Sequence, residues 1–181
     1  MAALTSTARM FRFDTARWQR MATTSTLAGA GLVVSGTYLL LAFDRFGIQG
    51  FVEARATARL LLTGLYGWLG LAVASWLVAR LAWQQRPPFE LVMRLFGHAH
   101  VPLLLVAVAI QFLSVGLRLS GVLLWPALFA VLVWMPAQLI IAAEVSFSLE
   151  KPRAALTVLG PYVAWVVIVG RLLETQLGHL L

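Results

Sequence analysis

Two histidines separated by one residue, His98 and His100, are the first candidates for chemistry in this chain. On an extended strand such a pair shares one face and can ligate a metal ion, but on a helix the two side chains point roughly 200° apart. The closest acidic residue is Glu90, and His179 is a poor second haem ligand for either histidine. We therefore expect polar residues at an interface, and we predict neither a metal site nor a cofactor.

Three further polar residues stand within or at the end of long apolar runs: Gln111, Gln138 and Glu144. An ionisable residue inside a membrane marks function by default, whereas a glutamine there more often hydrogen-bonds a neighbouring helix. Glu144 is close enough to the end of its run to be solvated. These three residues are the candidates for an intramembrane polar site.

The sequence carries none of the common catalytic signatures. It has no phosphate-binding loop, nucleophile elbow, His-Glu-x-x-His motif or dinucleotide fingerprint. It also has no cysteine, which excludes disulfides, thiolate catalysis, iron–sulfur clusters and Cys-ligated zinc. The polar connections are too short to hold a catalytic domain, so we predict that the protein is not an enzyme.

The elements that position these residues follow from composition. Hydrophobic residues make up 61% of the 181 residues and charged residues 12%, against about 45–50% and about 25% in soluble domains. A soluble fold of this size could not hide so much apolar surface. The expected fold is an all-α, polytopic integral membrane helix bundle.

A membrane-spanning helix needs about 20 mostly apolar residues, and five segments qualify. The predicted spans cover residues 24–43, 60–83, 100–117, 121–143 and 154–173. Together they form one transmembrane domain, 24–181, preceded by a surface segment, 1–23.

The third and fourth spans are separated by only a few residues. Arg118 and Gly121 are expected to mark a tight turn there. Pro126 and Pro136 lie inside the fourth span, and each removes a backbone donor. They predict kinks or local unwinding, which a membrane tolerates only where neighbouring groups satisfy the freed carbonyls.

The surface segment alternates aromatic and basic residues, as an amphipathic helix on a membrane does. Trp18 is expected to anchor it at the interface. Its composition also resembles a mitochondrial transit peptide. The expected contacts with anionic lipid headgroups are Arg9, Arg12, Arg17 and Arg20. The net charge of +7 is explained in this way, so we predict no nucleic-acid partner.

Orientation follows from the Lys and Arg residues, which are enriched in cytoplasmic connections. With five spans, most of these residues fall on the side that holds the N-terminus. The N-terminus is therefore expected in the cytoplasm and the C-terminus outside. The expected location is the inner (plasma) membrane of a bacterial cell.

Small residues recur on two of the predicted spans. Gly64, Gly67 and Gly70 are spaced by three residues on the second span, and Gly29 and Gly36 lie on the first. Such faces let another helix approach closely in lipid. They can serve packing within the chain or contact with another membrane protein subunit, and the sequence leaves both open.

Residues 60–174 resemble the membrane domain of the Yip family, the Ypt/Rab-GTPase-interacting proteins, which has bacterial relatives. The resemblance is carried by a polar hairpin, a Gly-x-Ala-x-x-Pro entry to the middle span and a Ser-x-x-Lys connection before the last. In this sequence these stand at Gln84–Glu90, Gly97–Pro102 and Ser148–Lys151. The resemblance implies five spans, a cytoplasmic N-terminus and a non-enzymatic adaptor. The long acidic tail of the eukaryotic members is missing, so GTPase binding is not implied.

These features predict an accessory or scaffold subunit that stabilises or assembles a larger membrane protein complex. The first alternative is a small permease or channel-like transport protein, suggested by prolines near Gln138 and Glu144. The second is a membrane anchor of a redox complex, suggested by His98 and His100.

Overall fold

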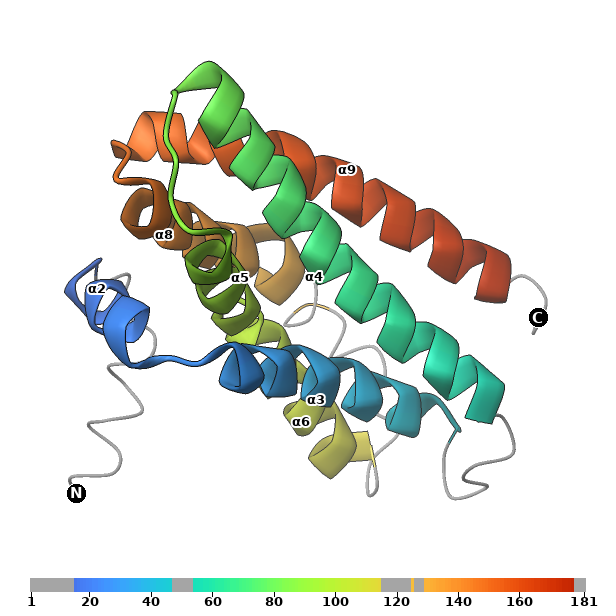
Figure 1. The fold of residues 1–181 in the computed structure, drawn as a ribbon. Helices are drawn as coiled ribbons and strands as arrows, with labels where there is room; N and C mark the ends of the chain where they lie inside the picture. The colour runs from blue at the N-terminus through green and yellow to red at the C-terminus, as the bar shows by residue number, and fades with distance from the viewer. Residues whose placement is uncertain (1–14, 47–53, 115–124, 126–128, 178–181) are drawn as a thin grey trace, which may run out of the picture.

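A computed structural model describes residues 15–46, 54–114, 125 and 129–177 of the chain (Figure 1). Throughout these residues the secondary structure is helical, with short connections and no strand. The elements are α2 (Thr15–Thr24), α3 (Leu27–Phe46), α4 (Ala54–Ala82), α5 (Phe89–His98), α6 (Val101–Ser114), the π-helix η2 (Ala130–Trp134), α8 (Met135–Phe147) and α9 (Lys151–Leu177). The predicted all-helical class is confirmed for this part of the chain.

Among the described residues, three helical segments are long and apolar enough to cross a membrane: Thr57–Ala82, Phe89–Ala109 and Ala130–Phe147. A fourth arises if α2 and α3, which meet at a bend of 112°, form one broken span. The predicted turn at Arg118 and Gly121 lies outside the described residues. The number of spans beyond these segments stays a prediction.

The segment predicted to begin near His100 begins earlier in the structure. Helix α5 starts at Phe89, directly after two prolines, and only a short turn separates it from α6. The turn falls where it does because Pro102 has no backbone N–H and therefore suits the first turn of a new helix. The charged residues Glu90 and Arg94 interrupt the apolar run, so the sequence did not predict α5 as part of the span. The other face of α5 is apolar and buried.

The break between α2 and α3 is stabilised by two hydrogen bonds. The Thr26 hydroxyl accepts the Gly29 N–H at 3.0 Å, which makes Thr26 the N-cap of α3. Arg94 on α5 donates from Nη1 to the Ser25 carbonyl at 2.8 Å. Arg94 thus brings a positive charge to the C-terminal end of α2 and satisfies the Ser25 carbonyl, which has no partner within the helix.

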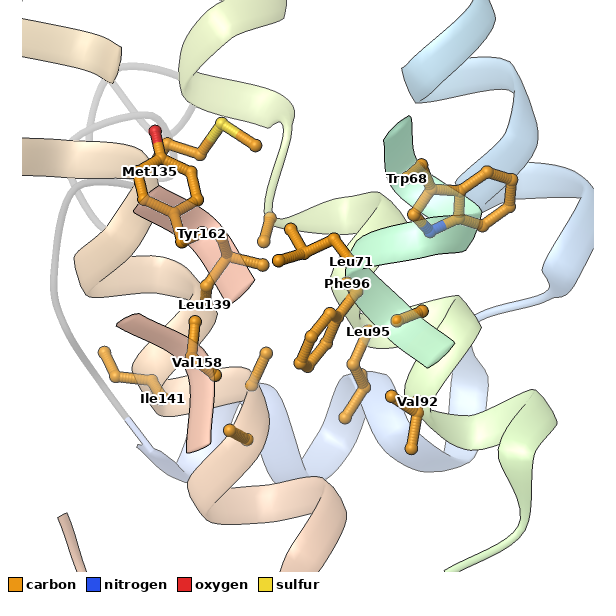
Figure 2. Packing of buried hydrophobic residues seen from close by; sticks show 14 of the residues in the cluster. Trp68, Leu71, Val92, Leu95, Phe96, Met135, Leu139, Ile141, Val158 and Tyr162 are labelled. Carbon is orange, nitrogen blue, oxygen red and sulfur yellow. The ribbon is translucent and has the colours of Figure 1, made fainter. Parts of the chain in front are cut away.

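Helix α5 lies at the centre of the bundle, between α3, α4 and α8 (Figure 1). Its side chains Leu95 and Phe96 are fully buried, and Figure 2 shows them among core residues of α4, α8 and α9. The Phe96 ring meets Phe147 edge to face at 6.3 Å. Trp68 of α4 donates from its indole to the Met93 carbonyl at 3.1 Å, which ties α4 to α5.

Helices α3 and α5 approach closely at Gly97. A Cβ placed on Gly97 would lie 2.6 Å from the Cβ of Ala30, too close for any real pair of carbon atoms. In lipid, where burial of apolar surface drives association weakly, such close approach maximises dispersion contacts. Gly97 therefore sets the spacing of the central helix.

The π-helix η2 shows how the backbone accommodates Pro136, which has no N–H to donate. At the end of η2 the Met135 N–H donates to the Ala130 carbonyl, five residues back. The same register would require the next residue, Pro136, to donate to Val131, but proline has no N–H. Instead the Tyr162 hydroxyl of α9 donates to the Val131 carbonyl. The local unwinding expected at Pro136 is present, whereas Pro126 lies outside the described residues.

Candidate functional site: a pocket beneath helix α2

A pocket of about 30 Å³ lies where α2 crosses the α5–α6 turn and the η2–α8 helix. That volume holds about two water-sized groups, so it admits part of a ligand at most. Its lining combines polar groups with aromatic and aliphatic ones: Arg17, Trp18, Met21, His98, Val101, Pro102, Leu105, Trp134 and Gln138. The pocket brings together three residues that the sequence had singled out: Arg17, His98 and Gln138.

One wall of the pocket is fixed by a hydrogen bond between helices. The Trp18 indole donates to Gln138 Oε1 at 3.2 Å, and the two side chains are only 4% and 7% exposed. Trp18 was expected to anchor at the interface, and instead it is buried against α8. The bond satisfies both polar groups in apolar surroundings and docks α2 on the bundle.

The two candidate histidines face different neighbours. His98 Nδ1 lies 2.8 Å from the Arg94 carbonyl, and its ring is half-buried and lines the pocket. His100 is fully buried, with Nδ1 3.0 Å from the Phe96 carbonyl and its ring 6.4 Å from that of Trp165. Both carbonyls belong to α5, and that of Phe96 lies in its last turn, where carbonyls lack partners within the helix.

Buried polar atoms without partners gather around His100. Its Nε2 and the Trp165 Nε1 both lack a hydrogen-bond partner in the described structure. Within the same residues, no three histidine or acidic side chains converge on a possible metal position. The redox alternative stays a prediction, because His179 lies outside the described residues.

Of the three candidates for an intramembrane polar site, the two with described side chains, Gln138 and Glu144, are not brought together. Gln138 lines the pocket, whereas Glu144 lies six residues further along α8, about 9 Å by helical rise. Glu144 is half-buried, and its Oε2 has no hydrogen-bond partner within the described part of the chain. Gln111 lies on α6, and its side chain is outside the described set.

The glycines of α4 do not share one neighbour. A Cβ on Gly64 would collide with the Tyr38 ring of α3, and one on Gly67 would collide with the Trp165 indole of α9. A Cβ on Gly70 would meet nothing within 4 Å. Two of the three positions thus serve packing within the chain, and one is open.

The glycines of α3 are packed less tightly. A Cβ on Gly29 would lie 3.3 Å from Thr26 Oγ1 and 3.8 Å from His98 Nε2. One on Gly36 would lie 3.8 Å from a methyl group of Leu104 on α6. A Cβ on either glycine would thus be in ordinary van der Waals contact with its neighbour across the helix interface.

Of the residues predicted to contact lipid headgroups, two are described. Arg17 is half-buried and lines the pocket, while Arg20 is exposed on the same helix. Arg9 and Arg12 fall in the undescribed first 14 residues. Arg17 is thus the described member of the set that lines the same pocket as His98 and Gln138.

Sequence reasoning missed Arg94, which fixes the α2–α3 break and lies 3.8 Å from Glu90. The signal was a Glu and an Arg four residues apart inside an apolar stretch. It also missed Tyr38 and Tyr162, whose positions depend on other helices.

No protein-family model, curated protein or solved structure matches this chain, and its resemblance to the Yip family stays a prediction from sequence.

Proposed function

We propose that this chain is a non-enzymatic integral membrane protein that serves as an accessory or scaffold subunit of a larger membrane protein complex. The observation that carries the proposal is the open glycine on the outer face of α4. Gly70 is exposed and meets no internal neighbour, although Gly64 and Gly67 on the same helix do.

Helices α4 and α9 pack against each other (Figure 1), and each presents an outer face of large exposed apolar side chains. On α4 these are Leu62, Tyr66, Leu69, Val73, Leu77 and Leu81. On α9 they are Leu156, Leu159, Val163, Val167 and Ile168. Gly160 interrupts the second face as Gly70 interrupts the first, and it too has open space around it.

An exposed glycine inside a helix lowers the stability of the helix and gains no packing contact within the chain in exchange. Relative to alanine, it is about 1 kcal/mol less favourable in water. Lipid chains fill such a notch with little selectivity, whereas a partner helix gains close backbone contact there. Gly70 and Gly160 therefore support docking of another subunit's helix.

The topology that we propose has five spans, with the N-terminus in the cytoplasm of a bacterial cell. Support comes from the end of the bundle where α4 meets α5 and α8 meets α9, which Figure 1 shows at the top. Arg80 stacks over Trp76 at 4.9 Å and Arg153 over Trp83 at 5.4 Å. Basic and aromatic residues together are typical of the cytoplasmic interface.

A native isolation tests the proposed role. The full chain, tagged and extracted from its own membranes with mild detergent, should co-purify with larger membrane proteins in fixed ratio. A chain that migrates alone as a monomer in native gels from those membranes would contradict the proposal.

Two variants of α4 separate docking from folding. Gly70→Leu should leave the thermal unfolding temperature of the purified chain unchanged and should release the co-purifying partner. Ala58→Leu places the same side chain at another exposed position of α4 and should release nothing. If Gly70→Leu retains the partner as fully as the wild type does, the α4 face is not the docking surface.

A second candidate, a small permease or channel-like protein, is favoured by one observation. The distorted backbone of η2 adjoins the pocket that Gln138 lines, and irregular backbone at membrane depth often borders a cavity. Against it, the Tyr162 hydroxyl already satisfies the Val131 carbonyl. Solute flux in reconstituted vesicles that Gln138→Leu abolishes would favour this candidate over the scaffold.

A further inference from the structure

We propose that the outer face of α2 is covered by a membrane-embedded helix of a partner subunit, which carries an acidic side chain opposite Arg20. That face consists of the exposed residues Gln19, Arg20, Thr23 and Thr24. The proposal rests on the accessory role proposed above and gives it a second, polar contact surface. Helix α2 packs against α5 and α8 (Figure 1), so this surface is distinct from the glycine-bearing faces of α4 and α9.

The depth of α2 in the bundle is the first step. The Trp18 indole donates to Gln138 Oε1 at 3.2 Å, and His98 lines the pocket beneath α2. Gln138 and His98 lie near the middle of Ala130–Phe147 and Phe89–Ala109, two segments that are long and apolar enough to cross a membrane. With these segments across the bilayer, as the proposed topology has them, α2 is docked about halfway through it.

Helix α2 does not lead straight from this depth to a membrane surface. It turns by 112° from α3, so its axis is closer to perpendicular than to parallel with that of α3. Gln138 is eight residues or more from either end of its segment, which is about 12 Å of helical rise. An arginine side chain is shorter than that, so Arg20 does not bring its charge to the headgroups by extending toward them.

Two of the four polar side chains on this face are satisfied within α2. The Thr23 and Thr24 hydroxyls donate to the Arg20 carbonyl at 2.8 and 3.0 Å, a bond that threonines in helices form without water. Gln19 and Arg20 remain as an exposed amide and an exposed positive charge. A charged side chain at this depth pairs with another charge, or faces protein or a water-filled cavity, because exposing it to lipid is costly.

Charge complementarity defines the partner. Helix α2 has two basic residues and no acidic one, and none of the residues that line the pocket beneath it is acidic. A carboxylate on a neighbouring helix would accept two parallel hydrogen bonds from the Arg20 guanidinium. The adjacent Gln19 amide would bond to the same helix, as amides do between helices in lipid. The partner is therefore an apolar helix with one acidic residue near its middle.

A spin label shows what covers α2. The chain has no cysteine, so a nitroxide on Thr23→Cys is the single label of the full chain, which is isolated with its partner and placed in lipid nanodiscs. Oxygen concentrates in lipid and a nickel chelate stays in water, so collisions with each identify the surroundings. We expect Thr23→Cys to collide weakly with both. Leu32→Cys, at an exposed leucine of α3, should collide with oxygen, and Arg86→Cys, in the exposed α4–α5 connection, with the chelate.

Charge variants test the chemistry of the partner. Arg20→Gln should reduce the amount of partner retained by the chain about tenfold or more, because the acidic side chain of the partner is left buried and unpaired. Arg86→Gln removes one exposed charge from the α4–α5 connection and should leave retention unchanged. Equal retention by these two variants would overturn the proposal.

The collision data separate the other occupants. Strong oxygen collisions at Thr23→Cys would show lipid, strong chelate collisions a water-filled cavity, and spin–spin broadening a second copy of this chain. Any of the three would overturn the proposal. A chain that purifies alone would remove the accessory role and this proposal together. A complex that purifies with Thr23→Cys still open to oxygen or chelate would remove this proposal alone.

Discussion

At the scale of single residues, the meaning of a glycine in this chain depends on what stands opposite it. Gly64 and Gly67 face aromatic rings, whereas Gly70 faces open space. The same residue type at regular spacing therefore has two roles. A substitution at each position should report which role applies.

Gly67→Leu should destabilise the isolated chain, because its side chain would overlap the Trp165 indole. Forced overpacking of this kind costs about 1–3 kcal/mol. Leu69→Ala, which truncates a side chain that is already 40% exposed, should cost much less. Thermal unfolding in detergent measures both, and an unfolding temperature for Gly67→Leu at or above that of Leu69→Ala would show that the α4–α9 contact is looser than described.

At the scale of elements, the π-helix shows how one helix can depend on another. Pro136 deprives the Val131 carbonyl of its donor within the segment, and Tyr162 on α9 replaces that donor. The pairing also fixes how α9 is rotated against η2. The backbone hydrogen bonding of η2 is therefore complete only when α9 is packed against it.

Tyr162→Phe should lower the unfolding free energy by about 1–3 kcal/mol, because the Val131 carbonyl loses its partner in apolar surroundings. Pro136→Ala restores a backbone N–H, so the same Tyr162→Phe change should cost less in that background. Unfolding of the four variants in mixed micelles measures the coupling. Tyr66→Phe, at an exposed tyrosine of α4, is the matched control. Equal costs in both backgrounds would remove the link between the proline and the tyrosine.

At the scale of the whole molecule, a group of four basic residues marks one end of the bundle. Arg80, Arg86, Lys151 and Arg153 lie near the α4–α5 and α8–α9 connections. The opposite end of α4 begins at Ala54. If α4 crosses the membrane, these two ends must lie on different sides.

The absence of cysteine makes the topology easy to measure. Single substitutions Ala58→Cys, Arg86→Cys and Glu150→Cys fall at exposed positions. A membrane-impermeant thiol reagent should label Ala58→Cys in intact cells, and the other two only after permeabilisation. Labelling of Ala58→Cys and Arg86→Cys from the same side would contradict a spanning α4, and the reverse pattern would invert the proposed orientation.

The sequence by itself determined the helical class and the apolar segments, because composition and run length depend on the solvent and not on the neighbours. It also singled out Gln138 and Pro136 as positions that need polar partners. Those partners, Trp18 and Tyr162, lie on other helices, and no periodicity along one segment reports them.

Only the tertiary structure decided how the singled-out residues divide among sites. It separated His98 from His100, buried Trp18, and joined Arg17 to His98 and Gln138 in one pocket. The physical reason is that helices in lipid associate through local fit, set by small residues such as Gly97 against Ala30. That fit fixes rotation and depth, and these two quantities determine which side chains meet.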